Sequence, residues 1–297
     1  MNRNRTLALA GSTLLLLALM PLSASAGEGT FDSAGVPIHF DDMGGDGEPV
    51  VLVHSFTSTS DMWTNAGFGP SDELRFIALD VRGHGQSGKP EGDDAYGIEM
   101  AEDVVRLLDH LGIEDAHVAG YSMGAEIALK LATKHPERVR SVVAGGSGWS
   151  PAEAYEVYSY AAMSLDTATT LGESVQAMMP PEVTDEQIAF LLGTMERHGI
   201  DIENDGPAAL ASVARSMDEL IDLTELEVAG IDVPVLGIVS ENDSERLYIE
   251  RMDGVVPDFT LELIPAGPTG DPSMDHLSAT LDPTFHDSIV EFLVDQS

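Results

Sequence analysis

Short, uninterrupted apolar runs recur along the chain and alternate with longer segments of helical periodicity. An apolar run rich in β-branched residues and bounded by turn residues is typical of a strand buried on both faces of a parallel sheet. Runs of this kind occupy residues 50–53, 75–80, 116–120, 139–144, 233–239 and 260–264. A shorter strand at 36–40, followed by the glycine-rich turn 44–47, predicts a hairpin at one edge of the sheet.

Helical patterns lie between these runs. Between residues 100 and 111 the apolar side chains share one helix face, and Gly112 is placed to end that helix. Residues 123–135 predict a second helix, and residues 283–293 predict a third that starts with a proline in its first turn. Strands that alternate with helices predict an α/β fold with a doubly wound, mostly parallel sheet.

The alternation stops between Trp149 and Gly230, where the composition is helical and strand-like runs are few. This interruption predicts a helical cap, residues 150–230, inserted into a core made of residues 27–149 and 231–297. Several methionines of the insert either pack its own small core or line a pliable apolar pocket. They are Met163, Met178, Met179, Met195 and Met217.

The first 26 residues resemble a secretory signal peptide. Arg3 and Arg5 precede an apolar stretch, residues 7–22, and Ala24-Ser25-Ala26 supplies the small residues that a signal peptidase requires. The stretch is short for a permanent membrane span of about 20 residues. We therefore expect cleavage after Ala26, export to the periplasm or the exterior, and no membrane association afterwards.

Acidic residues outnumber basic ones, with 51 Asp and Glu against 14 Lys and Arg and a formal net charge of −37. Such a surface repels phosphate backbones and anionic membranes, which argues against nucleic-acid binding, and salt would relieve its self-repulsion. Cysteine is absent, so thiol nucleophiles, Cys-ligated zinc and iron–sulfur clusters are excluded. The sequence also lacks HExxH spacing, a phosphate loop and a dinucleotide fingerprint, so we expect no metal and no cofactor.

The segment Gly120-Tyr121-Ser122-Met123-Gly124 lies between a predicted buried strand and a predicted helix. A GxSxG segment in that position predicts a nucleophile elbow, in which a sharp turn exposes the serine hydroxyl at a helix N-terminus. The flanking glycines leave room for the turn. Ser122 is therefore the candidate nucleophile.

A serine nucleophile needs a base, and the base is held in turn by an acid. Asp243 follows the strand 233–239, which places a carboxylate at the same sheet edge as Ser122. His276 comes after the strand that ends at Ile264 and before the last helix. The order Ser122, Asp243, His276 is the order that this fold requires.

The chain resembles the α/β-hydrolase superfamily, and in particular its esterase, lactonase and C–C hydrolase branch. The match rests on residues 53–56, 80–90 and 120–124, together with Asp243 and His276. The resemblance implies that the backbone N–H groups of Phe56 and Met123 form an oxyanion hole and that the insert covers Ser122. It also implies structural roles for His54, Asp80 and His84.

Two positions depart from the family pattern. Ser55 stands where glycine is usual in the oxyanion loop, and Asp275 stands where glycine is usual before the histidine. A shifted loop backbone is the expected effect of Ser55. We interpret Asp275 as solvated rather than as a group that tunes the histidine.

A serine at the elbow, rather than aspartate, argues against dehalogenase and epoxide hydrolase chemistry. We expect a serine hydrolase that cleaves a small, uncharged or apolar carboxylic ester or lactone through an acyl-serine. C–C bond hydrolysis and perhydrolysis use the same three residues and remain alternatives. A non-catalytic binding protein or receptor is a further alternative, because fold alone does not fix function.

Overall fold

The computed structural model describes residues 26–297 except 180–182, 198–199, 201, 203–205 and 268–269. The predicted signal peptide lies outside the described residues apart from Ala26, so cleavage and export stay predictions. In the part of the chain that is described, no helix combines the length and the apolar composition needed to cross a membrane.

Eight strands form one sheet in the order β1-β2-β4-β3-β5-β6-β7-β8. Their bounds are β1 Gly27–Ser33, β2 Val36–Asp42, β3 Glu48–Val53, β4 Leu74–Leu79, β5 Ala116–Tyr121, β6 Val139–Gly145, β7 Val235–Ser240 and β8 Phe259–Ile264. All neighbours from β4 to β8 pair in parallel, and only the pairs that involve β2 are antiparallel. The predicted mostly parallel, doubly wound sheet is confirmed.

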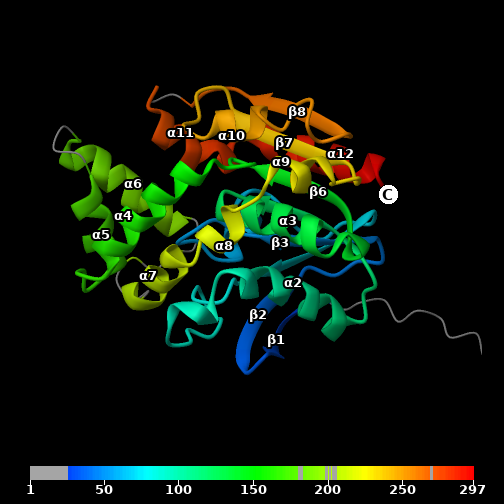
Figure 1. Ribbon diagram of the computed structural model, residues 1–297, viewed down its shortest axis with the longest axis horizontal. Helices are drawn as coiled ribbons and strands as arrows, with labels where there is room; N and C mark the ends of the chain where they lie inside the picture. The colour runs from blue at the N-terminus through cyan, green and yellow to red at the C-terminus, as the bar shows by residue number, and fades with distance from the viewer. Residues whose placement is uncertain (1–25, 180–182, 198–199, 201, 203–205, 268–269) are drawn as a thin grey trace, which may run out of the picture.

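Helices cover both faces of the sheet (Figure 1). Their bounds are α1 Asp61–Asn65, α2 Ile98–Leu111, α3 Met123–Lys134, α4 Tyr155–Leu165, α5 Leu171–Met178, α6 Asp185–Arg197, α7 Pro207–Arg215, α8 Asp218–Ile221, α9 Glu225–Ala229, α10 Arg246–Glu250, α11 Pro272–Ser278 and α12 Pro283–Asp295, with short 3₁₀ turns η1 Asp93–Ala95, η2 Pro136–Arg138, η3 Ala152–Ala154 and η4 Ala279–Leu281. One core lies between the sheet and α2 and α3, and another lies between the sheet and α1 and α12. The predicted helix ends at Gly112, which adopts a left-handed conformation with φ 68°.

The N-terminal edge differs from the expected hairpin. Strand β1 was not predicted, because only Phe31 and Ser33 of its residues are buried and the alternation is therefore weak. The turn of the hairpin is Ala34-Gly35, both with positive φ, and it joins β1 to β2. The glycine-rich turn at 44–47 instead carries the chain from β2 to β3, which are separated in the sheet by β4.

Helices α4 to α9 lie between β6 and β7 in the chain, and α4 to α7 gather beside one end of the sheet (Figure 1). A separate apolar cluster, which includes Leu165, Leu171 and Met195, holds this cap together. Met217 is buried against the main core, and Met163 is exposed. None of the five methionines singled out from the sequence is among the described residues that line the cavity at Ser122.

Candidate active site

Ser122 lies at the sharp turn from β5 into α3. Its φ of 53° and ψ of −116° are unfavourable for a residue with a side chain, as a nucleophile elbow requires. A Cβ added to Gly120 would lie 2.0 Å from the carbonyl oxygen of Gly124, and one added to Gly124 would lie 2.1 Å from that of Val53. The two glycines are therefore needed because backbone fills the space that a side chain would occupy.

The structure brings the three residues predicted from chain order into one line of hydrogen-bonding groups. His276 Nε2 lies 3.1 Å from Ser122 Oγ, and His276 Nδ1 lies 3.0 Å from each carboxylate oxygen of Asp243. The side chain of Asp243 is fully buried, whereas that of His276 is 14% exposed. The carboxylate thus fixes the ring so that Nε2 faces the hydroxyl, which is the arrangement of a nucleophile, a base and an orienting acid.

The electrostatic surroundings of His276 favour its protonated form. Burial alone would lower the pKa of His276, but the charge of Glu245 and the hydrogen bond and charge of Asp243 raise it, with a further contribution from Glu126. The net result is a pKa of about 9. The imidazole can therefore accept a proton strongly, but it is available as a base only once it has lost its own.

The expected oxyanion-hole residues border the same space. Phe56 lines the cavity at Ser122, and Met123 is the first residue of α3, where the N–H has no acceptor within its own helix. The next residue of the loop, Thr57, has a φ of 63°, which is strained for a β-branched residue, and its N–H is bonded to His84 Nε2. Donation by Phe56 and Met123 to a substrate oxygen stays a prediction.

The histidines beneath this loop are buried and bonded to backbone. His54 Nε2 accepts a hydrogen bond from the N–H of Val81, and its Nδ1 lies 2.8 Å from the carbonyl oxygen of Ser55. Burial, with the neighbouring His54, lowers the pKa of His84 to about 3. Neither ring is hydrogen-bonded to Ser122, and both connect the loop after β3 to the segment after β4.

A cavity of about 220 Å³ opens beside Ser122 and His276. Its walls come from the loop after β3, from α3, from α4 of the cap and from the segments before α10 and within α11. The volume lies below the range of about 300–1,000 Å³ that is usual for drug-sized ligands. The space is suited to a small substrate.

Glu126 is a buried acid on the wall of this cavity that the sequence did not single out. It is 3% exposed and accepts hydrogen bonds of 2.8 Å from both Tyr158 and Ser150. Burial and the charge of Glu245 raise the pKa of Glu126 to about 8 despite these hydrogen bonds. In the sequence, Glu126 lies four residues after Ser122 and looks like an ordinary surface residue of α3. Its burial becomes evident only once the cap covers it.

The interpretation of Asp275 as solvated is wrong. Asp275 is 1% exposed, and its Oδ2 accepts hydrogen bonds from Ser240 Oγ at 3.2 Å and from the N–H of Gly267 at 3.0 Å. The reason is that residues 272–278 form α11 rather than a loop, which turns this carboxylate inward. Asp275 therefore joins the end of β7 to the segment that precedes His276.

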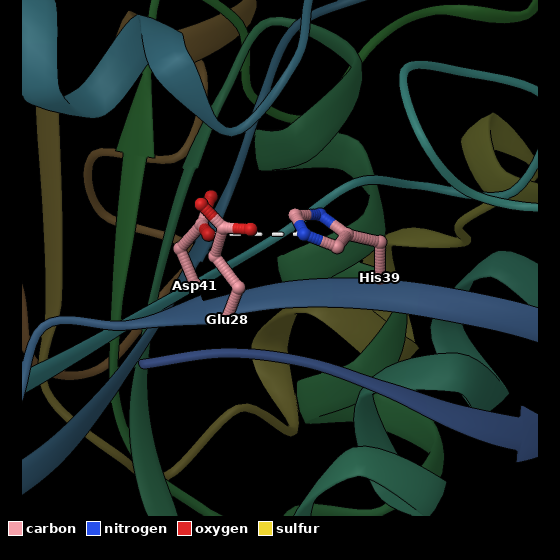
Figure 2. Close-up of side chains that lie close together, drawn as sticks. All are labelled: Glu28, His39 and Asp41. Atoms are coloured by element: carbon pink, nitrogen blue, oxygen red, sulfur yellow. Dashed lines mark ion pairs between the residues drawn. The ribbon is translucent and has the colours of Figure 1, made fainter. Parts of the chain in front are cut away.

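One group of metal-ligating residues occurs among the described residues, away from this cavity. Glu28, His39 and Asp41 bring one candidate ligand atom each within 4.8 Å of one another, and Figure 2 shows the two carboxylates beside the imidazole. They come from the paired strands β1 and β2, so linear spacing gave no signal. Both nitrogens of His39 have protein neighbours, with Nδ1 3.2 Å from Asp80 and Nε2 3.3 Å from the Gln86 amide. We assign no metal to this group.

Comparisons with known proteins agree with this fold. A family model described as alpha/beta hydrolase fold matches residues 48–189. The dihydrolipoyllysine-residue acetyltransferase component of an acetoin cleaving system from Pseudomonas putida is 43% identical over 104 residues, which cover 34% of this chain and 27% of that protein. The chain thus spans well under half the length of the first curated relatives that it matches.

Solved structures align over nearly the whole chain. A thermophilic esterase from Thermogutta terrifontis is 27% identical, with 92% of this chain and 99% of that chain covered and a TM-score of 0.71. An enol-lactonase from Burkholderia xenovorans LB400 is 22% identical, with 90% and 99% covered and a TM-score of 0.72. With the eight-stranded sheet, the serine elbow and the matched family model, the chain belongs to the α/β-hydrolase superfamily.

Proposed function

We propose that this protein is a serine hydrolase that cleaves a small carboxylic ester or lactone. The observation that carries the proposal is the continuous hydrogen-bonded series from Asp243 through His276 to Ser122 at a strained elbow. The backbone strain at Ser122 costs of order 1–3 kcal/mol, which such a site tolerates when the exposed hydroxyl has a chemical role. The relatives named as an esterase and an enol-lactonase support the same reaction class.

The reaction follows from the geometry. Ser122 Oγ attacks the carbonyl carbon while its proton passes to His276 Nε2, and the carbonyl oxygen takes up the negative charge. Collapse of this intermediate breaks the bond to the leaving alkoxide, which receives the proton from His276. Water then attacks the acyl-serine with the same help from His276, and the carboxylic acid leaves as Ser122 recovers its proton.

The oxyanion-hole N–H groups and the carboxylate of Asp243 complete the proposed mechanism. The N–H groups of Phe56 and Met123 stabilise the developing oxyanion, an effect worth about 3–4 kcal/mol for one donor in other acyl-transfer enzymes. Asp243 keeps the proton on Nδ1 of His276, so that Nε2 faces Ser122, and it stabilises the imidazolium that forms in each step.

Active-site labelling with a fluorophosphonate tests the proposal, because this reagent reacts with activated serines. We expect the wild-type protein to be labelled and both Ser122→Ala and His276→Ala to be unlabelled while remaining folded. Hydrolysis of short-chain p-nitrophenyl esters should disappear with the label. Absence of labelling in a folded wild-type protein, over a range of salt concentrations, would reject the serine-hydrolase function in favour of a binding role.

A further inference from the structure

The cavity beside Ser122 is lined by carboxylates and aromatic rings. Its two acids are Glu126 and Glu245, and its aromatic residues are Phe56, Tyr121, Tyr158 and Tyr248. Among the described residues that line it, His276 is the sole basic side chain. The cavity thus has a composition that disfavours anionic substrates and favours cations.

The carboxylate of Glu245 is balanced only by the imidazole of His276, whose pKa it raises, among the described residues that line the cavity. It lies half-buried on the cavity wall, and in the described part of the chain no lysine or arginine pairs with it. The neighbouring Arg246 is engaged elsewhere, with Glu250 at 2.7 Å and the carbonyl oxygen of Glu241 at 2.8 Å. When His276 is neutral, as it must be to act as a base, this partly buried carboxylate loses that opposite charge, so a cation in the cavity would be stabilised there.

Glu126 adds a second acid to the same wall, and aromatic rings stand beside it. The Phe56 and Tyr158 rings pack edge to face with centroids 6.0 Å apart, and Tyr158 also holds the Glu126 carboxyl. The faces of aromatic rings attract cations within about 6 Å, by roughly 0.5–2 kcal/mol according to how far the site is desolvated. Rings and carboxylates together are the usual components of a site for a positively charged nitrogen.

We propose that this cavity binds an ammonium group of the substrate, so that the preferred esters or lactones carry a positively charged nitrogen near the reacting carbonyl. The inference rests on the proposed function and specifies its substrate class. It replaces the expectation of an uncharged or apolar substrate, which was based on the overall composition rather than on this wall. Glu245 and Glu126 are the specificity-determining residues.

The charges of Glu245 and Glu126 also make the pKa of His276 depend on the charge of the bound substrate. Both raise the pKa of His276, which lies with them on the cavity wall. Tyr158 and Ser150 bond Glu126 from the cap side, while Tyr248 and Glu245 face it from the segment around α10. A bound cation offsets the carboxylate charges, so it lowers the pKa of His276 and leaves more of the base neutral at a given pH.

The test compares two thioesters of nearly equal shape, acetylthiocholine and neohexyl thioacetate, in which carbon replaces the ammonium nitrogen. We expect the wild-type kcat/KM to favour the cationic ester by about tenfold. Glu245→Gln should remove most of that preference. Glu241→Gln is the matched control, because it makes the same charge change on an exposed residue outside the cavity and should leave the preference unchanged.

Two further readouts separate the cavity from the general negative charge of the protein. The preference should persist at about 0.5 M NaCl, where long-range attraction between exposed charges is screened. The kcat of wild-type protein should rise with pH at a lower midpoint for the cationic ester than for the neutral one, since this profile reports the base in the substrate complex. If Glu245 had a merely structural role, the two esters would give the same midpoint.

Competition for fluorophosphonate labelling covers the case in which neither thioester is cleaved. Choline should protect Ser122 better than neohexanol does, and Glu245→Gln should abolish the difference. Equal protection by the two alcohols, or equal kcat/KM for the two esters, overturns the cation site while leaving the serine hydrolase in place. Failure of the wild-type protein to be labelled rejects the hydrolase itself.

Discussion

At the scale of single residues, the pKa of His276 determines when the candidate site can work. A base acts only in its neutral form, so a pKa of about 9 means that kcat/KM for a neutral ester rises with pH through about 9. Below that pH the imidazole is protonated and cannot take the proton of Ser122. The measurement is a pH–rate profile for a short-chain neutral ester.

Replacing Glu245 by glutamine tests the direction in which this residue shifts the pKa of His276. The charge of Glu245 is the largest single cause that raises the pKa of His276, so its neutralisation should move the midpoint of the profile to lower pH. Glu241→Gln, on the exposed side of the same loop, should leave the midpoint in place. A wild-type midpoint near the ordinary histidine value of about 6.5 would contradict the assigned surroundings of the base.

Some residues of the candidate site could be recognised from the sequence, and others could not. Ser122 lies in a motif that carries its own backbone requirement, and Asp243 and His276 follow from chain order in the fold. Glu126 and Glu245 could not be recognised, because their significance depends on the cap folding over α3 and on the two carboxylates lining one cavity. Neither event leaves a local pattern in the sequence.

At the scale of the elements, close contact between β3 and α3 determines the shape of the elbow. Replacing Gly124 by alanine would favour α3 by about 1 kcal/mol in helix propensity. The new Cβ, however, would lie 2.1 Å from the carbonyl oxygen of Val53 and 2.9 Å from that of His54. Because backbone cannot move aside cheaply, we expect a net destabilisation of at least about 2 kcal/mol.

Urea unfolding of Gly124→Ala measures this loss. Gly69→Ala is the control, since no atom lies within 4 Å of its added Cβ and its φ is not positive. The control should unfold at nearly the wild-type urea concentration, and the elbow variant well below it. A Gly124→Ala protein as stable as the wild type would show that α3 can shift away from β3 and that the elbow is not held rigidly.

The elements themselves were predictable in proportion to how much of each is buried. The strands from β3 to β7 are apolar runs that are mostly buried, so their positions were clear. Strand β8 is an edge strand in which only Ile264 is buried, and its apolar residues were still enough to mark it. Strand β1 lies at the sheet edge and buries too few side chains to show alternation. Helix α11 has seven residues, and its start is marked only by the cap Asp271 before Pro272. That weak signal was not recognised, and the position of Asp275 was misjudged as a result.

At the scale of the whole molecule, the large negative charge destabilises the folded state. A formal net charge of −37 on 297 residues gives self-repulsion that is stronger in the compact state than in the unfolded chain. Some ion pairs within the core offset part of this repulsion. One is Arg82 with Asp103 at 2.6 Å, where both side chains are almost inaccessible to solvent. Exposed pairs such as Arg140 with Glu48 contribute little, because water and salt screen them.

Added salt should therefore stabilise the protein. The Debye length falls from about 10 Å at 0.1 M to about 3 Å at 1 M, so repulsion between exposed carboxylates is screened before the buried Arg82–Asp103 pair is affected. We expect the Tm to rise by about 5 °C or more between low salt and 1 M NaCl, measured by circular dichroism. Sucrose at matched osmolarity is the control, because solute exclusion also favours compact states without screening charge. A Tm that is insensitive to NaCl, or that rises equally in sucrose, would mean that self-repulsion is not what limits the stability of this fold.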